Sequence, residues 1–230
     1  MKPFIRYYGG KWRAAPHYPR PENGTIVEPF AGAAGYSMRY PYHQVILIEP
    51  YFALAEMWRW LIAAKREEVE RIPLVDDVED LPLWVPNGAR VLIGFAMNAA
   101  TATPRKRLSA GCRRLRENGR KLYGWTSPLR ERVAQQVMMI KHWKIIEGDY
   151  TMAPDVEATW FIDPPYSVMG NHYVHGSDCI DYQKLAAWSM NRQGQRIVCE
   201  QDGATWLPFR QLGTFKAGPS KRVSAEVIWP

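Results

Sequence analysis

Cysteine is scarce in this chain. Three cysteines occur among 230 residues, at positions 112, 179 and 199. They are odd in number and widely spaced, so they form neither a disulfide framework nor the paired spacing of a zinc site. We interpret them as reduced thiols of a cytoplasmic protein, and the sequence predicts no bound metal.

Long apolar runs are also missing. No stretch approaches the roughly 20 apolar residues that a membrane-spanning helix needs. Lys2 and Arg6 flank only a few apolar residues, whereas a signal peptide has a longer apolar region. Internal repeats and low-complexity segments are lacking too. The lack of a spanning run and of a signal peptide predicts a protein without membrane contact.

The chain does have enough apolar residues for a core, and an excess of positive charge. Apolar residues make up 47% of it, which suits one large domain or one domain with an insertion. The 30 Lys and Arg outnumber the 23 Asp and Glu, which gives a net charge of +7. This excess favours a polyanionic partner, with nucleic acid first.

Strand-like and helix-like segments alternate along the chain. Strands are predicted at 25–30, 44–50, 144–150, 158–166, 195–201 and 224–230, and helices at 51–72, 127–143 and 180–192. Residues 89–97 fit either a strand or the start of a helix. Such alternation favours an α/β fold in which helices cover both faces of a mostly parallel sheet.

One segment breaks the alternation and resembles an insertion. Residues 105–121 read RKRLSAGCRRLRENGRK, with eight Lys or Arg and one Glu. So many like charges repel one another without an anionic partner, and we expect DNA phosphates to be that partner. The alternative is a solvated helix face. The predicted phosphate contacts are Arg105, Lys106, Arg107, Arg113, Arg114, Arg116, Arg120 and Lys121.

The stretch TWFIDPPYSVMG, residues 159–170, ends an apolar run with a carboxylate. Ligands of doubly wound sheets bind beyond the carboxyl ends of the strands, which is where we expect Asp163. Pro164 and Pro165 lack N–H groups and restrict the backbone. Asp163 and the Pro164 carbonyl can accept hydrogen bonds from an amino group while Tyr166 stacks on its heterocycle. The alternative is an ordinary turn after a strand.

Other acids follow strands in the same way. The stretch VEPFAGAAG, residues 27–35, opens a turn of small residues, which lets a ligand approach the backbone closely. Glu49 ends the next strand, 17 residues after Gly32, where an acid can hold ribose hydroxyls. Asp149 ends a further strand and can accept from an adenine amino group. Each acid alone is more simply a cap or a surface charge, but together they outline a nucleoside site beside Asp163.

In this order, the motifs resemble those of the Dam-like (D12 class) adenine-specific DNA methyltransferases, which use S-adenosylmethionine. KPFIRYYGGKWRAAP resembles the N-terminal cofactor motif of that family, VEPFAGAAG its glycine-rich motif, LIEP its ribose-binding strand end and FIDPPY its catalytic motif. The resemblance covers residues 1–60 and 145–230. The glycine-rich turn of the family usually reads Phe-x-Gly-x-Gly, whereas here Ala34 replaces the second glycine and Gly35 follows.

The resemblance implies a Rossmann-like class I methyltransferase fold. Its cofactor-binding and catalytic domain would span 1–97 and 145–230, with a basic target-recognition insertion over 98–144. The implied cofactor-binding residues are Tyr8, Gly10, Lys11, Glu28, Phe30, Gly32, Glu49, Asp149 and Asp163, with Lys11 on the methionine carboxylate. Asp163, Pro164, Pro165 and Tyr166 would hold the target adenine as catalytic residues.

The implied activity is methyl transfer from S-adenosylmethionine to the N6 amino group of adenine in double-stranded DNA, after base flipping. One alternative is a cytosine N4 methyltransferase, although such enzymes more often carry Ser in place of Asp163. Another is an RNA adenine methyltransferase, where Asn commonly replaces the acid. A third is a catalytically weak nucleic-acid-binding protein that retains the fold. We expect a monomer or weak dimer, and an orphan enzyme of a bacterial or phage-infected cell.

Overall fold

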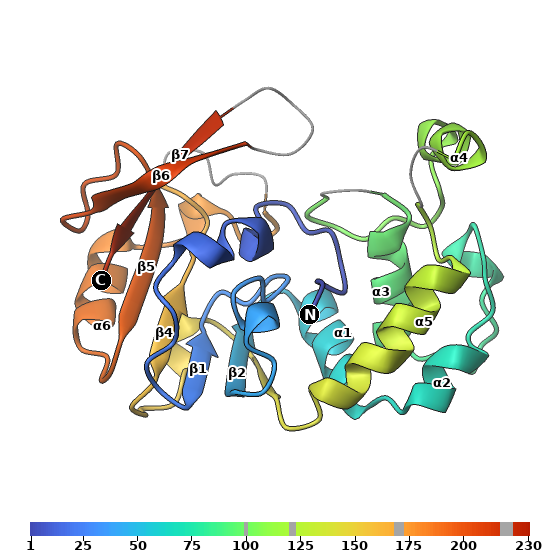
Figure 1. Ribbon diagram of the computed structural model, residues 1–230, viewed down its shortest axis with the longest axis horizontal. Helices are drawn as coiled ribbons and strands as arrows, with labels where there is room; N and C mark the ends of the chain where they lie inside the picture. Colours follow the sequence, from blue (N-terminus) through green and yellow to red (C-terminus); the bar gives the residue numbers. More distant parts are fainter. Residues whose placement is uncertain (99–100, 120–122, 168–172, 217–222) are drawn as a thin grey trace.

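A computed structural model describes residues 1–98, 101–119, 123–167, 173–216 and 223–230. It contains one seven-stranded sheet in the order β3-β2-β1-β4-β5-β7-β6 (Figure 1). The strands are β1 (Thr25–Glu28), β2 (Gln44–Glu49), β3 (Lys144–Glu147), β4 (Thr159–Ile162), β5 (Arg196–Gln201), β6 (Arg210–Lys216) and β7 (Val223–Trp229). Neighbours from β3 to β5 are parallel, while β7 runs antiparallel to β5 and β6. The prediction of an α/β fold with a mostly parallel sheet is therefore confirmed.

The helices match the predicted pattern with two differences, one of which is that the helix expected over 127–143 ends at Gln136. The described residues form α1 (Phe52–Ala63), α2 (Arg66–Arg71), α3 (Asn87–Ala96), α4 (Ala110–Glu117), α5 (Ser127–Gln136) and α6 (Tyr182–Met190). The single helix expected over 51–72 is wrong, because Ala64 and Lys65 adopt extended backbone angles between α1 and α2. Residues 89–97, for which two alternatives were open, lie mainly in α3. Among the described residues, no helix has the length and apolar character needed to cross a membrane.

Short 3₁₀ turns complete the described elements. They are Lys11–Arg13, Ala15–His17, Ser37–Arg39, Val78–Asp80, Val137–Met139, Tyr150–Met152 and Ser177–Cys179. The first two belong to the N-terminal segment, which crosses above the sheet (Figure 1). That crossing brings the N-terminus of the chain to the edge at which the parallel strands end.

Alternating strand residues divide between two hydrophobic clusters. Ile26 and Leu47 pack with α1 and the N-terminal segment, whereas Val27 and Ile48 pack with α6 on the opposite face. Helices therefore cover both faces, as the continuous apolar runs of these strands predicted.

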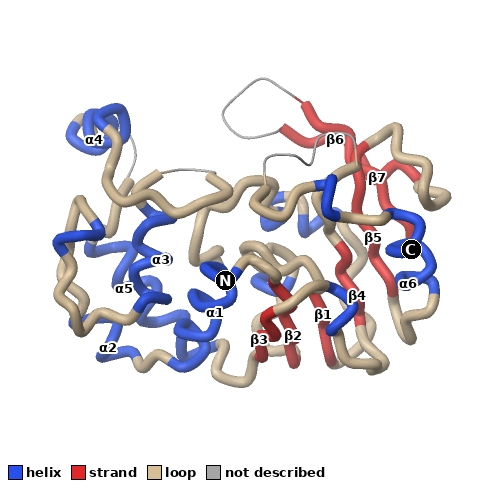
Figure 2. Tube along the Cα trace, turned by 180° about the vertical axis from the view of Figure 1, so that it is seen from behind, coloured by secondary structure: helices blue, strands red, loops and turns tan. Residues whose placement is uncertain are grey.

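The helices between β2 and β3 gather beside the β3 edge of the sheet, a placement that Figures 1 and 2 show from opposite sides. Leu108, Trp125 and Val133 belong to the same hydrophobic cluster as Phe161 of the sheet. The described part of 98–144 thus shares its core with the rest of the chain, and a target-recognition insertion over that range stays a prediction. Helix α4 projects from this region beyond the carboxyl edge of the sheet (Figure 2).

The acids singled out in the sequence meet at that carboxyl edge. Glu28 and Glu49 are the last residues of β1 and β2, and Asp163 directly follows β4. Asp149 was expected to end a strand, but β3 ends at Glu147 and Asp149 lies two positions beyond it. The sheet extends from β1 through β2 and β3 in one direction and through β4 and β5 in the other. Ligands bind at such a switch point in doubly wound sheets, so this edge is the place to look for a site.

Candidate functional site

A cavity of about 640 Å³ opens at the carboxyl edge of the sheet. This volume falls within the range of small-molecule sites. All residues predicted to bind a cofactor line it, namely Tyr8, Gly10, Lys11, Glu28, Phe30, Gly32, Glu49, Asp149 and Asp163. Pro165 lines it as well, whereas Pro164 and Tyr166 do not. The structure brings these residues together, while their roles stay predictions.

The small-residue turn after β1 is tied to the end of β2. The N–H of Gly32 donates to Glu49 Oε2 at 2.9 Å, and the N–H of Tyr51 donates to Glu49 Oε1 at 3.0 Å. Burial raises the pKa of Glu49 to about 7, although both hydrogen bonds favour its ionised form. Each carboxylate oxygen can accept a further hydrogen bond, so ribose hydroxyls can still bind there.

The altered glycine turn contains a strained residue and a close approach. Ala34 has a φ of +49°, in the left-handed region that disfavours residues with a Cβ. At Gly35 a Cβ would lie 2.7 Å from the backbone nitrogen of Trp12 and 2.9 Å from that of Lys11. Gly35 therefore lets the N-terminal segment that carries Lys11 pack directly against the turn.

Substitutions in this turn should change stability in opposite directions. We expect Ala34→Gly to raise the free energy of unfolding by up to about 1 kcal/mol, because relief of the backbone strain exceeds the added unfolded-state entropy. Gly35→Ala should lower it by about 1–3 kcal/mol, because the new methyl group meets backbone atoms. Urea unfolding of both variants measures the two effects. A Gly35→Ala chain as stable as the wild type would contradict the close approach.

At the other end of the cavity lie two aromatic rings and an acid. Phe30 and Tyr150 stack with ring centroids 5.6 Å apart. Asp149 Oδ1 accepts from the N–H of Thr151 at 2.8 Å and from its hydroxyl, which caps the turn Tyr150–Met152. Asp149 therefore combines the capping role with a place in the cavity wall, and the two interpretations of this residue are compatible.

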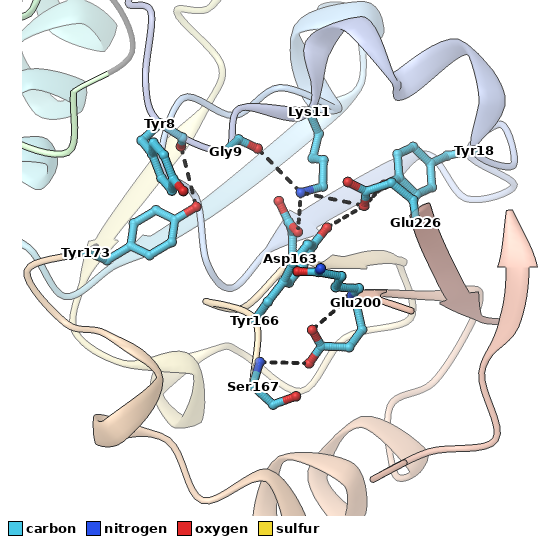
Figure 3. A network of polar contacts seen from close by, with 11 residues as sticks. Tyr8, Gly9, Lys11, Tyr18, Asp163, Tyr166, Ser167, Tyr173, Glu200 and Glu226 are labelled. Carbon is cyan, nitrogen blue, oxygen red and sulfur yellow. Dashed lines mark hydrogen bonds and ion pairs between the residues drawn. The ribbon is translucent and has the colours of Figure 1, made fainter. Parts of the chain in front are cut away.

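Lys11 occupies the centre of a charged network (Figure 3). Its Nζ lies 3.1 Å from Asp163 Oδ1, 3.9 Å from Glu226 Oε2 and 4.4 Å from the centre of the Tyr166 ring. Burial by itself lowers the pKa of Lys11, but Asp163 and Glu226 raise it above its usual value. The ammonium is therefore charged. Its partner in this structure is Asp163, a contact that the sequence did not indicate.

Burial and the Lys11 ammonium act in opposite directions on the pKa of Asp163. Burial raises its pKa to about 6, Lys11 opposes this rise, and Glu226 adds to it. Its Oδ1 is buried and accepts no hydrogen bond from any described residue, although the Lys11 ammonium lies within ion-pair distance. A ligand N–H group can use this oxygen as an acceptor once the Lys11 ammonium moves away from it.

The turn after β4 is held from two sides. The hydroxyl of Tyr166 donates to Glu226, and one face of the Tyr166 ring faces the Lys11 ammonium. The carbonyl of Pro165 accepts from the hydroxyl of Tyr182 in α6 at 2.6 Å. A base that stacks on Tyr166 must therefore use its other face or displace Lys11.

Glu200 and Glu226 belong to the site but were not predicted. Glu200 is fully buried in β5 and accepts from the N–H of Ser167 at 3.1 Å and from the indole of Trp206 at 2.9 Å. Glu226 lies in β7 beside Lys11. In RIVCEQ and VSAEVIW a lone acid interrupts an apolar strand, and such an acid needs a buried partner. That signal was available in the sequence.

Tyr173 also lines the cavity and was not predicted. Its ring packs edge-on against Tyr8 with centroids 5.6 Å apart, and its hydroxyl donates to the Tyr8 carbonyl at 3.5 Å. No periodic pattern or motif in the sequence distinguishes this tyrosine from the others. It closes the wall between the N-terminal segment and the chain that follows β4.

The buried acid Glu28 gives the cavity an unusual pH response. Glu28 accepts from the N–H of Ser37 at 2.7 Å, yet burial raises its pKa to about 8. A carboxyl group whose folded pKa is raised stabilises the fold most below its unfolded pKa, and this contribution is lost as pH rises towards 8. The wild-type free energy of unfolding should therefore fall over this interval.

We expect Glu28→Gln to remove this loss. The variant should gain stability relative to the wild type by up to about 1.4 kcal/mol per pH unit between pH 5 and 8. Urea unfolding at several pH values measures the difference, with Glu70→Gln on exposed α2 as the control. Parallel stability curves for Glu28→Gln and the wild type would show that Glu28 does not titrate in this interval.

The basic segment has anionic partners within the chain. The pairs are Arg116 with Asp76 at 2.6 Å, Arg107 with Asp77 at 3.3 Å and Lys106 with Glu79 at 2.6 Å. Backbone hydrogen bonds join the same two stretches, from Val78 N–H to the Lys106 carbonyl at 2.7 Å and from Leu108 N–H to the Asp76 carbonyl at 2.9 Å. The argument that these charges lack a partner in the chain is therefore corrected, because the acidic stretch 76–79 supplies one.

The other predicted phosphate contacts are either exposed or outside the described residues. Arg105, Arg113 and Arg114 are exposed. Arg120 and Lys121 lie outside the described residues. Exposed guanidinium groups on and beside α4 are thus the part of the segment that can meet a phosphate without first breaking an ion pair.

Neither a scan against protein-family models nor a search of curated proteins finds a match to the chain. The resemblance to the Dam-like methyltransferases therefore rests on the sequence motifs and their order.

Among the described residues, no three His, Cys, Asp or Glu side chains are grouped so that they could hold a metal ion. The acids at the carboxyl edge instead contact backbone N–H groups, hydroxyls and Lys11.

Proposed function

We propose that the chain transfers a methyl group from S-adenosylmethionine to the N6 amino group of adenine in DNA. The observation that carries this proposal is the convergence of all nine implied cofactor residues on one cavity. The order of β3 to β5 agrees with that of doubly wound nucleotide-binding sheets, and the cavity lies at the switch point. A class I methyltransferase fold is part of the proposal.

The charges of the cavity suit this cofactor. S-adenosylmethionine has a sulfonium, an ammonium and a carboxylate. The wall contains Glu28, Glu49 and Asp163, whose pKa values are raised mainly by burial. A cation placed among these carboxylates offsets their desolvation. Lys11 lines the cavity and pairs with Asp163, so its ammonium can share its charge between that acid and a bound carboxylate.

Asp163 has the central role in the proposed reaction. When bound, S-adenosylmethionine supplies an electrophilic methyl group on a positively charged sulfur. Asp163 accepts a hydrogen bond from the adenine amino group through Oδ1, which raises the electron density of the nitrogen. Positioning the nitrogen in line with the methyl group removes a large part of the barrier, and the proton that the nitrogen loses leaves to solvent.

The surface around the cavity supports a DNA partner. Helix α4 and the adjoining ends of strands β6 and β7 lie on the side of the sheet that bears the cavity (Figures 1 and 2). Arg105, Arg113 and Arg114 are exposed on or beside α4. Guanidinium groups on the same side of the sheet as the cavity can hold phosphates of a duplex whose target base is flipped out.

Label transfer tests the proposal directly. The chain is incubated with S-adenosylmethionine labelled in its methyl group and, in separate reactions, with duplex DNA or with RNA, and the nucleosides are then separated. Label in N6-methyladenine is expected. Label in N4-methylcytosine, or in RNA alone, would support the corresponding alternative. Saturable DNA binding without label would support a catalytically weak binding protein.

The cofactor site has its own test. We expect S-adenosylhomocysteine at about 100 times its Kd to stabilise the fold by about 2.7 kcal/mol, because it binds only the folded chain. Glu49→Ala should reduce the resulting rise in Tm, since a ribose contact is lost, while Asp155→Ala on the exposed surface should not. Thermal unfolding with and without ligand measures both. An undiminished rise in Glu49→Ala would remove Glu49 from the ribose site.

A further inference from the structure

Glu226 lies in the antiparallel strand β7, yet its carboxylate reaches the pair formed by Lys11 and Asp163 (Figure 3). The residue is 7% exposed. Its Oε2 accepts from the hydroxyl of Tyr18 at 3.3 Å and from that of Tyr166, and lies 3.9 Å from Lys11 Nζ. The N-terminal segment, the turn after β4 and the last strand thus meet at one oxygen.

A purely structural role gives a poor account of this acid. A neutral amide in the same place offers an oxygen to the tyrosine hydroxyls at a lower desolvation cost. The carboxylate adds a second negative charge beside Asp163, so that one ammonium serves two buried acids. The negative charge of Glu226 therefore competes with that of Asp163 for the Lys11 ammonium.

That competition affects the oxygen that the proposed reaction needs. Asp163 Oδ1 is the atom that Lys11 approaches, and the same atom would accept from the target amino group. Glu226 is the other carboxylate within ion-pair distance of Lys11 among the described residues. A small shift of the ammonium towards Glu226 uncovers Asp163 without removing the charge from the site.

We propose that Glu226 is a positioning residue for methyl transfer, which holds the Tyr166 ring by its hydroxyl and draws Lys11 away from Asp163 when the target amino group arrives. This inference rests on the proposed function, in which Asp163 and Tyr166 receive the base. Glu226 itself touches neither substrate. It acts through the two residues that its Oε2 contacts.

Glu226→Gln tests the charge with little change of shape. We expect it to lower kcat by about 100-fold, the scale of a misplaced reacting group, and to leave the KM for S-adenosylmethionine nearly unchanged. Tyr18→Phe removes the other hydroxyl from the same oxygen and serves as the matched variant. Its kcat should fall by less than about 10-fold, because the charge of Glu226 and its contact with Tyr166 both remain. A Glu226→Gln chain with wild-type kcat would overturn the proposal.

Tyr166→Phe tests the tether if Glu226→Gln does not fold. It keeps the ring and removes the hydroxyl that Glu226 holds, so kcat should fall while cofactor binding remains. Wild-type kcat in Tyr166→Phe would overturn the tether.

The tether also has a readout that needs no catalysis. In protein labelled with ¹³C-tyrosine, the ring resonances of Tyr166 are assigned from their loss in Tyr166→Phe. We expect Glu226→Gln to shift them more than Tyr18→Phe does. A folded wild-type chain that transfers no methyl group would overturn the proposed function and the positioning role with it. Unshifted Tyr166 resonances in an active Glu226→Gln chain would overturn the tether alone.

Discussion

Asp163→Ala is expected to lower the rate of methyl transfer by at least about 100-fold, because the target amino group loses its acceptor. The Kd for S-adenosylmethionine should change much less, since Glu49 and the turn at Gly32 remain. Asp163→Asn should keep more activity than Asp163→Ala, because its amide oxygen still accepts a hydrogen bond. Single-turnover transfer of a labelled methyl group measures the rate, and calorimetry measures cofactor binding.

The control for this experiment removes a carboxylate far from the cavity. Asp155 is exposed, and its Oδ1 lies 3.6 Å from Arg192 Nη1. It does not line the cavity, so Asp155→Ala should keep the wild-type rate. Retention of most of the activity in Asp163→Ala would show that the carboxylate is not the acceptor. Loss of cofactor binding together with activity would instead assign Asp163 chiefly to the cofactor site, the other role that the resemblance implies.

The location of this acid was predictable because it depends on local pattern and on one topological rule. Apolar runs such as TWFI end at an acid, and the carboxyl ends of parallel strands meet at one edge. Glu28, Glu49 and Asp163 therefore had to lie near one another once the sheet was parallel. The small residues around Gly32 were equally informative, because a turn next to a ligand site requires close backbone approach.

The missing parts of the site depend on contacts between distant segments. Glu226 reaches Asp163 only because β7 runs antiparallel beside β5, in a register that no local pattern reveals. Strand β6 was not predicted. Its pairing with β7 shifts register between Gln211 and Gly213, so its residues do not alternate regularly along the strand. The ion pair of Lys11 likewise requires the N-terminal segment to cross the sheet edge.

The basic segment shows the same difficulty in its charges. Counting Lys and Arg over 105–121 located a strongly charged stretch, but the count could not reveal that Asp76, Asp77 and Glu79 lie against it. Charge pairing between segments is a tertiary property, so a run of like charge in the sequence overstates the field at the surface. The exposed residues of the segment, and not its total charge, are therefore the ones to test.

Replacement of Arg105, Arg113 and Arg114 together by Ala should weaken DNA binding for all sequences alike, because phosphate contacts carry no direct sequence information. Each lost contact releases fewer counterions, so the slope of log affinity against log salt should flatten by about one unit per arginine. Asp76→Asn should do the opposite and steepen it by up to about one unit, since Arg116 is freed from its bidentate pair. Salt titrations of DNA binding by fluorescence anisotropy measure both.

Arg66→Ala is the control for these slopes. Arg66 is an exposed arginine in α2 and pairs with Glu70 at 2.7 Å. Helix α2 lies away from α4 (Figure 1). Removal of Arg66 changes the net charge of the chain without touching the projecting helix, so the slope should match that of the wild type. A wild-type slope in the triple variant would mean that α4 is a solvated helix and that DNA meets another surface. A wild-type slope in Asp76→Asn alone would mean that Arg116 does not reach the phosphates even when its partner is removed, which would limit the DNA-binding surface to the outer face of α4 and Arg105.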